Sequence, residues 1–254
     1  MVDVKKDSAA SRREFLKQAG GSAALGASVA AVLPKPAQAS VAARGAKPRY
    51  GMLIDLRRCI GCHACSVACK SEFDVPLGST RSWVEYIEKG TYPEVKRSFL
   101  PRLCNHCTHP PCVDVCPAAA TWKREEDGIV VVDSDLCIGC GYCVLACPYD
   151  ARFMNPVTGS ADKCDFCLHR VSQGLVPSCV NTCMAGARIF GDLSDPESEI
   201  SQMIASNPVT VLRQEMGTEP NVYYIEADYT DPRIPGERAE YIRVETHRRK
   251  QERA

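Results

Sequence analysis

Residues 104–148 are CNHCTHPPCVDVCPAAATWKREEDGIVVVDSDLCIGCGYCVLACP, and this stretch decides the fold. It contains two runs of four cysteines. The first run starts at Cys104 and has the spacing Cys-x2-Cys-x4-Cys-x3-Cys-Pro. The second starts at Cys137 and has the spacing Cys-x2-Cys-x2-Cys-x3-Cys-Pro. The second spacing is the signature of bacterial ferredoxins.

The spacing follows from what an iron–sulfur cubane needs, which is four soft thiolates at tetrahedral corners. A short loop can supply only three of them. The fourth cysteine, three residues later and before a proline, binds the other cluster of a two-cluster unit. We therefore interpret residues 104–148 as one such unit, in which the two runs exchange their last cysteine.

All 16 cysteines of the 254-residue chain fall into four quartets of this kind. Two further quartets flank the central pair: Cys59-x2-Cys62-x2-Cys65-x3-Cys69 and Cys164-x2-Cys167-x11-Cys179-x3-Cys183. No cysteine is left over for a separate disulfide or a catalytic thiol. Because the motif repeats, we expect the outer quartets to form a second unit around the inner one.

The predicted fold class is α+β, with two interleaved bacterial-ferredoxin-like units that each hold two 4Fe-4S clusters, a hairpin insertion and a small C-terminal extension. The outer unit comprises residues 40–103 and 157–193, with the insertion at 71–98. The inner unit comprises residues 104–156. Residues 194–254 form the C-terminal extension and a charged tail.

Local patterns predict the individual elements. Alternating apolar residues and turn signals predict strands over residues 50–56, 83–87, 95–99, 186–191, 209–214 and 221–226. A hairpin is expected over residues 120–133, with Asp127-Gly128 at its turn. Helices are expected over residues 166–173 and 195–205, the latter with Ser194 or Asp195 as cap and Pro196 in its first turn.

Residues 1–39 have the parts of an export signal. Residues 11–17 are SRREFLK, which fits the twin-arginine motif. A mildly apolar run over residues 19–33 and an Ala-x-Ala site at residues 37–39 follow, as cleavable signals require. The run is shorter than the ~20 residues that a membrane span needs. We therefore expect twin-arginine export of the folded protein and a periplasmic location.

The composition of the remaining chain excludes some classes. Residues 1–39 contain six basic and three acidic residues, which leaves 25 basic and 28 acidic residues over 40–254. A mildly acidic chain gives no electrostatic reason to expect nucleic acid as a partner. The sequence after residue 39 contains no continuous apolar run long enough to cross a bilayer, so no transmembrane span of its own is predicted.

Three other uses of cysteine compete with iron–sulfur binding. Disulfides suit a periplasmic protein with an even cysteine count, but folding before export would occur where thiols stay reduced. Paired Cys-x2-Cys elements suit zinc, which does not need the third and fourth cysteines of these runs. The sequence from Cys59 to His63 matches a c-type haem attachment site, but haem would leave Cys65 without a role.

The polar residues near the quartets have two readings. His106 could donate to a cluster sulfur and tune its potential, or be a solvated loop residue. His63 is expected near the cluster or at the surface, and Trp83 and Trp122 are expected in packing. Three basic residues flank the fourth quartet and could balance cluster charge or meet a partner, with a solvated face as the default expectation: Lys163, Arg170 and Arg188.

Four quartets in this order resemble the iron–sulfur (B) subunit of the membrane-associated molybdopterin oxidoreductases, the dimethyl sulfoxide reductase family. The likeness runs over residues 48–226. It is greatest at residues 52–62, 100–107, 127–133 and 146–153, which look most like tetrathionate reductase B subunits. Polysulfide and thiosulfate reductase B subunits are similar too.

The resemblance implies four 4Fe-4S clusters, each bound by three cysteines of one quartet and the last cysteine of another. We call the four ligand sets groups 1 to 4. Group 1 is Cys59, Cys62, Cys65 and Cys183, and group 2 is Cys69, Cys164, Cys167 and Cys179. Group 3 is Cys104, Cys107, Cys112 and Cys147, and group 4 is Cys116, Cys137, Cys140 and Cys143. Some relatives lack one cysteine of the third quartet and hold a three-iron cluster there, but Cys140 is present here.

The resemblance also implies a function. The chain would be a non-catalytic electron-transfer subunit. It would connect a polytopic membrane subunit that handles quinol with a molybdopterin catalytic subunit that reduces a sulfur oxyanion such as tetrathionate. It would be peripheral on the membrane through a partner. Alternatives are a polysulfide or thiosulfate reductase subunit and a free periplasmic polyferredoxin carrier. An enzyme with its own open iron is disfavoured, because all 16 ligands are used and no phosphate loop or dinucleotide fingerprint exists.

Overall fold

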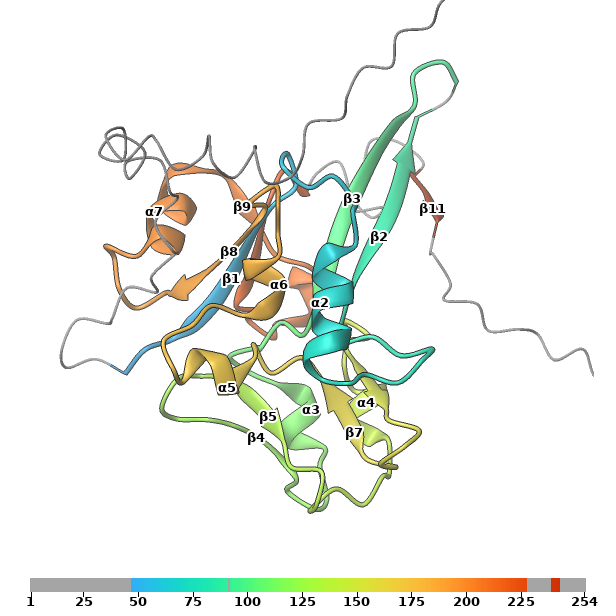
Figure 1. Cartoon of the computed structure of the whole chain (residues 1–254), viewed down its shortest axis with the longest axis vertical. Coiled ribbons are helices and arrows are strands. Elements are labelled where there is room, and N and C mark those ends of the chain that lie inside the picture. Colours follow the sequence, from blue (N-terminus) through green and yellow to red (C-terminus); the bar gives the residue numbers. More distant parts are fainter. Residues whose placement is uncertain (1–46, 91, 228–238, 243–254) are drawn as a thin grey trace, which may run out of the picture. The chain divides into compact units, whose positions relative to one another are not determined.

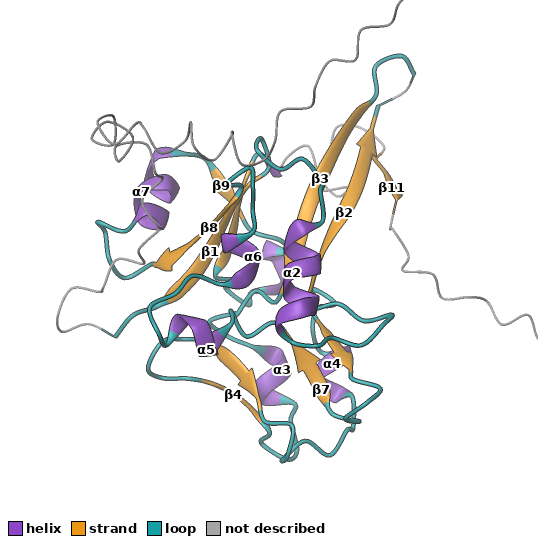
Figure 2. Ribbon diagram, in the orientation of Figure 1, coloured by secondary structure: helices purple, strands orange, loops and turns teal. Residues whose placement is uncertain are grey.

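The computed structural model describes residues 47–90, 92–227 and 239–242 (Figure 1). The predicted export signal, residues 1–39, lies outside the described residues, as does the basic end of the charged tail. Short helices and strands both occur throughout the described chain, in agreement with the predicted α+β class (Figure 2). Within the described part, none of the helices has the length and apolar character to cross a bilayer.

A four-stranded sheet joins the first strand of the described chain to three strands from residues 188–225. Its strand order is β8 (Arg188–Asp192), β1 (Tyr50–Asp55), β10 (Val222–Ile225) and β9 (Val209–Thr210). β1 runs parallel to β10 and antiparallel to β8. The segment predicted as a C-terminal extension therefore supplies two strands to the same sheet as β1.

β1 is apolar on both faces because both faces are covered. Met52 and Ile54 are fully buried on one face, in the main core of the molecule. Leu53 points to the other face, since neighbouring strand residues alternate, and packs with Ile200 of α7 (Glu199–Ser206). Burial of each such side chain stabilises the fold by about 1.5–3 kcal/mol.

The predicted insertion is a long antiparallel hairpin of β2 (Ser82–Lys89) and β3 (Lys96–Leu103). β11 (Ala239–Ile242) pairs with the free edge of β2. The helix α2 (Ala64–Glu72), which holds part of the first quartet, packs against β2 (Figure 1). The hairpin thus supports the first quartet.

Two small hairpins lie beside the inner quartets. One pairs β4 (Thr121–Lys123) with β5 (Val130–Val132), and the other pairs β6 (Arg152–Met154) with β7 (Ala161–Lys163). The first is the predicted Asp-Gly hairpin. Gly128 has a φ of 74° there, which glycine adopts without steric strain.

The other helices near the quartets are single turns: α3 (Pro111–Asp114), α4 (Tyr142–Leu145), α5 (Leu168–Val171) and α6 (Ser178–Asn181). α5 is shorter than the helix predicted over residues 166–173. Phe166 and Cys167 have φ values of 55° and 53°. This left-handed backbone cannot be part of a right-handed helix.

The predictions for residues 194–216 need two corrections. α7 begins at Glu199, not near Asp195, because Ser198 is its N-cap. The Ser198 hydroxyl accepts a hydrogen bond from the Ser201 N–H at 3.3 Å, which is the usual bond of a serine cap. The strand predicted over 209–214 ends at Thr210. Arg213 has a left-handed φ of 49° and precedes a 3-10 turn, which ends the extended backbone.

Candidate iron–sulfur cluster sites

The four quartet loops share one backbone turn. In each loop the residue just before the second cysteine has a positive φ: Gly61 (69°), His106 (44°), Gly139 (72°) and Phe166 (55°). Turns that alternate right- and left-handed backbone direct their N–H groups into one concavity and occur at many Fe–S sites. Four loops of different composition therefore share a left-handed residue at the same position of the motif.

His106 and Phe166 hold this turn without being glycine. Such a backbone costs of order 1–3 kcal/mol for a side-chain-bearing residue. Their rings are buried and stack on each other with centroids 3.8 Å apart, which offsets the strain. The solvated role considered for His106 is therefore wrong. Burial lowers the pKa of His106 well below its usual value, and its Nδ1 accepts a hydrogen bond from the Val130 N–H.

The last two cysteines of each quartet are four residues apart, which is about one helical turn. The helices α2, α3, α4 and α6 hold the third cysteine, and the fourth lies at or just beyond the end of the same turn. In every case the two thiols are predicted to belong to different groups. A single helical turn can thus link two neighbouring groups.

The helices pair as the exchange scheme requires. α2 of the first quartet contacts α6 of the fourth, and α3 of the second quartet contacts α4 of the third. Figure 1 shows α2 and α6 side by side. The outer quartets therefore meet each other, and the inner quartets meet each other.

Two pockets join thiols from distant quartets. The first is lined by Cys59, Cys62, Cys65 and Cys183, which are the four members of group 1. The second is lined by Cys104, Cys107, Cys112 and Cys147, which are the four members of group 3.

Group 2 is brought together deep in the core. Burial, and then the charges of Cys179 and Cys167, raise the pKa of Cys69 to about 12. Burial, and then Cys69 and Cys179, raise the pKa of Cys164 well above its usual value. Because thiolates are the metal-binding form, binding at such thiols must release protons.

Group 4 is only partly assembled by direct packing. Cys143 is buried in a small apolar cluster with Ala161, and Cys137 packs against it. Cys116 is half-buried and Cys140 is exposed, and neither belongs to that cluster.

The groups follow one another in a series. The thiol of Cys65 in group 1 acts electrostatically on Cys179 in group 2. Cys104 in group 3 acts on Cys164 in group 2. Cys112 in group 3 shares the small apolar cluster with Cys143 in group 4. The structure thus orders the groups 1, 2, 3, 4.

Orphaned polar atoms show that the group 3 pocket suits a sulfur-rich ligand. Asn105 lines it, is 1% exposed, and has no hydrogen-bond partner for either amide atom among the described residues. Nε and Nη1 of Arg152, which lines the same pocket, also lack one there. Buried donors are normally satisfied, and cluster sulfurs accept such bonds. The residues present therefore fit an iron–sulfur cluster.

Disulfides and zinc fit the arrangement of the cysteines less well. All 16 cysteines are free thiols. A tetrahedral zinc ion with Zn–S bonds of about 2.3 Å would hold its sulfurs about 3.8 Å apart. Among the described residues, no three Cys, His, Asp or Glu side chains come close enough to bind one ion. The thiol sets that the structure does assemble line pockets instead.

The basic residues of the fourth quartet differ from the prediction of a solvated face. Lys163 is buried and donates to the carbonyl oxygens of Val130 and Cys164. Arg188 is buried and donates to Ser82 Oγ at 3.0 Å. Only Arg170 is partly exposed. Hydrogen bonds offset part of the cost of taking the Lys163 and Arg188 cations out of water.

Asn105 and Arg152 were not predicted as site residues. Asn105 lies inside the second quartet, where a polar loop residue attracts no notice. For Arg152 a signal exists. An Ala-Arg pair follows the last cysteine of both the third and the fourth quartets. Its arginine, Arg152 or Arg188, stands five residues after that cysteine.

Comparison with known proteins gives matches along the same segments. A 4Fe-4S dicluster domain model matches residues 95–193, and a 4Fe-4S binding domain model matches residues 50–71. The B subunit of tetrathionate reductase from Salmonella typhimurium is 50% identical over 224 residues, covering 86% of this chain and 89% of the relative. The B subunit of selenate reductase from Mesobacillus selenatarsenatis is 38% identical, covering 85% and 97%. A putative dimethyl sulfoxide reductase iron-sulfur B subunit from Halobacterium salinarum is 42% identical, covering 72% and 81%.

Proposed function

Because the chain belongs to the iron–sulfur (B) subunits of the dimethyl sulfoxide reductase family, we propose that it conducts electrons through four 4Fe-4S clusters held by groups 1 to 4. It is a non-catalytic electron-transfer subunit of a reductase complex. The clusters supply one-electron redox chemistry. The chain's own residues set where the clusters lie, how far they are from water and which charges surround them.

The single observation that carries this proposal is the make-up of the two four-cysteine pockets. Each unites three thiols of one quartet with the last thiol of a partner quartet, Cys183 in one case and Cys147 in the other. Two interleaved ferredoxin-like units require this exchange. The contacts of α2 with α6 and of α3 with α4 support the same arrangement.

The surface at the two ends of the series supports electron entry and exit there. Beside group 1, Ile60 is 58% exposed and Met184 is 76% exposed. Beside group 4, Ile138, Tyr142 and Leu145 are exposed. Apolar side chains gathered next to exposed thiols are typical of protein contact sites. One partner docks at each end.

The partners follow from the family. We propose a molybdopterin catalytic subunit and a polytopic membrane subunit that handles quinol, with this chain in the periplasm after twin-arginine export and held on the membrane through its partner. The likeness to the B subunit of tetrathionate reductase favours tetrathionate as the terminal acceptor. Polysulfide, thiosulfate or a related acceptor would be reduced if the catalytic partner differs.

Purification in mild detergent tests the complex. The tagged protein should bring down a molybdenum protein and a membrane protein, and membranes should oxidise quinol with tetrathionate. A clean monomer from every preparation would contradict the complex and favour a free polyferredoxin carrier. Replacing Arg12 and Arg13 by Lys tests the location, because the variant should stay in the cytoplasm; a normally exported variant would refute the signal.

A further inference from the structure

Two arginines occupy equivalent positions in the internal repeat. Arg152 stands five residues after Cys147, and Arg188 stands five residues after Cys183. Each is the first residue of a strand, β6 and β8 respectively. The two halves of the repeat therefore place an arginine at the same point after the last cysteine.

The hydrogen bonds of the two arginines repeat as well. Arg152 Nη2 donates to Thr121 Oγ1 at 2.9 Å, and Arg188 Nη2 donates to Ser82 Oγ at 3.0 Å. Thr121 and Ser82 are each the first residue of a strand, β4 and β2. A hydroxyl thus fixes each guanidinium in the same way in both units.

Each guanidinium lies where two thiol groups meet. Arg188 lines the group 1 pocket and interacts electrostatically with Cys65 of group 1 and Cys179 of group 2. Arg152 lines the group 3 pocket and interacts with Cys112 of group 3 and Cys143 of group 4. The same cation position therefore occurs once in each pair of groups.

Neither charge has an acidic partner to explain its burial. Arg152 and Arg188 are 4% and 3% exposed, and among the described residues neither forms an ion pair with a carboxylate. Burying an unpaired charge is strongly unfavourable, and arginine does not lose its proton in proteins. The balancing negative charge must come from the thiol groups and what they bind.

We propose that Arg188 and Arg152 each hold a permanent positive charge between two neighbouring clusters and raise the reduction potentials of both. This inference rests on the proposed four clusters. A cluster with four thiolates is anionic and becomes more so when it takes an electron, so a fixed cation stabilises the reduced form more. Net charge and hydrogen bonds to sulfur are established determinants of cluster potential. Arg188 acts on groups 1 and 2, and Arg152 on groups 3 and 4.

The test is a redox titration of the purified complex, followed by electron paramagnetic resonance. Arg188→Gln should lower the potentials of two clusters and leave the other two unchanged, and Arg152→Gln should do the reverse. We expect about a tenfold change in each reduction equilibrium, which is ~59 mV for one electron. Arg188→Lys keeps the charge and should restore most of the shift. Arg97→Gln, which removes an exposed cation from β3, is the matched control and should shift nothing.

Iron content separates the possible failures. A wild-type protein without about 16 irons would refute the proposed clusters themselves. Full iron with unchanged potentials in both Gln variants would overturn the role of the arginines. If Arg188→Gln loses iron, Arg152→Gln decides the question, because the two arginines occupy equivalent positions in the repeat. Lower potentials for the clusters of groups 3 and 4 alone in that variant support the proposal, and unchanged potentials overturn it.

Discussion

Groups 2 and 3 are buried in the middle of the series, whereas groups 1 and 4 reach the surface. All four thiols of group 2 are buried. Group 1 exposes Cys62, and group 4 exposes Cys140. The four quartets share one backbone turn, so the turn alone does not decide this difference. Burial by residues outside the quartets makes the difference, and under the proposed function it would assign conduction to the middle groups and electron exchange to the ends.

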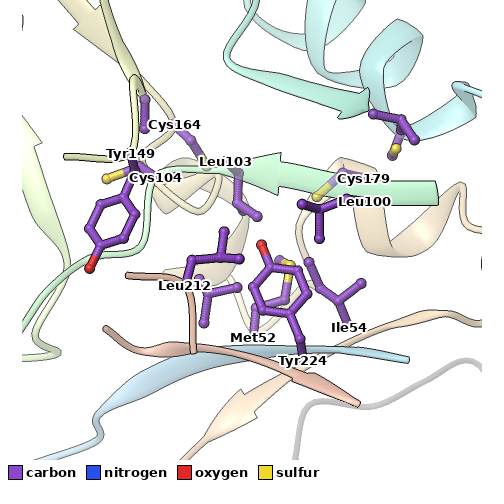
Figure 3. Close-up of a cluster of buried hydrophobic side chains, with 14 of the residues drawn as sticks. Met52, Ile54, Leu100, Leu103, Cys104, Tyr149, Cys164, Cys179, Leu212 and Tyr224 are labelled. Carbon is purple, nitrogen blue, oxygen red and sulfur yellow. The ribbon is translucent and has the colours of Figure 1, made fainter. Parts of the chain in front are cut away.

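The difference has a structural origin in the core. The thiols of Cys104, Cys164 and Cys179 lie in the same apolar core as Met52 and Tyr224 (Figure 3). Of the group 4 thiols, Cys143 and Cys137 pack in a small separate cluster. Loss of a middle group should therefore affect the whole fold, and loss of group 4 should affect only its own loop.

Removal of one ligand from each kind of site should give the largest contrast. Cys164→Ser puts a hydroxyl in the core and breaks group 2, so we expect loss of several kcal/mol of stability and of most of the iron. Cys140→Ser should lose at most about four of roughly 16 irons and keep the fold. Iron analysis and thermal unfolding measure both. Equal losses in the two variants would show that burial does not distinguish the sites.

Arg102 forms a buried ion pair within the β2–β3 hairpin and a hydrogen bond from the hairpin to the inner unit, and its removal should give the next largest effect. Arg102 donates to Glu85 at 2.9 Å and to the carbonyl oxygen of Tyr149 at 2.8 Å. Arg102→Ala leaves a buried carboxylate without this partner and should cost about 3–5 kcal/mol. Denaturant unfolding measures the change.

The same hairpin offers the control for this variant. Arg97 pairs with Glu88 at the surface, and an exposed pair contributes about 0–1 kcal/mol. Arg97→Ala should therefore change stability very little. A similar loss of unfolding free energy for Arg97→Ala and Arg102→Ala would mean that the buried contacts of Arg102 do not hold the hairpin to the inner unit.

The loops of the two end groups should respond differently to an added methyl group. A Cβ at Gly61 of group 1 would overlap the Phe99 ring, whereas a Cβ at Gly141 of group 4 would meet open space. Both glycines have positive φ, which costs an alanine about 1–2 kcal/mol. Gly61→Ala adds overpacking of about 1–3 kcal/mol. Equal melting temperatures for Gly61→Ala and Gly141→Ala would contradict this packing of the group 1 loop on the hairpin.

The smallest effect should come from a helix on the far face of the sheet. Ser198 caps α7, and loss of such a cap should cost about 1 kcal/mol. α7 packs on the face of β1 opposite the main core. Ser198→Ala should therefore lower the melting temperature by a few degrees without changing iron content. Loss of iron in this variant would show that the packing of α7 on the sheet also stabilises the cluster sites.

Much of this arrangement could be predicted from local sequence. Cysteine spacing identified the quartets, and the Asp127-Gly128 turn and alternating apolar residues identified the hairpins. The pairing of β10 with β1 could not be predicted, because it joins strands that are distant in the sequence. The burial of His106, Lys163 and Arg188 was also missed, since isolated charged residues are usually solvated. Their hydrogen-bond partners, such as Val130 and Ser82, are brought to them only by the tertiary fold.

The exchange of the last cysteine between quartets is the central claim, and Cys183→Ser tests it most directly. Cys183 belongs to the fourth quartet in sequence, but it lines the pocket of Cys59 and Cys62. We predict that Cys183→Ser and Cys59→Ser alter the same electron paramagnetic resonance signal, and that Cys164→Ser alters a different one. The exchange would be contradicted if Cys183→Ser and Cys164→Ser altered the same signal and Cys59→Ser altered a different one.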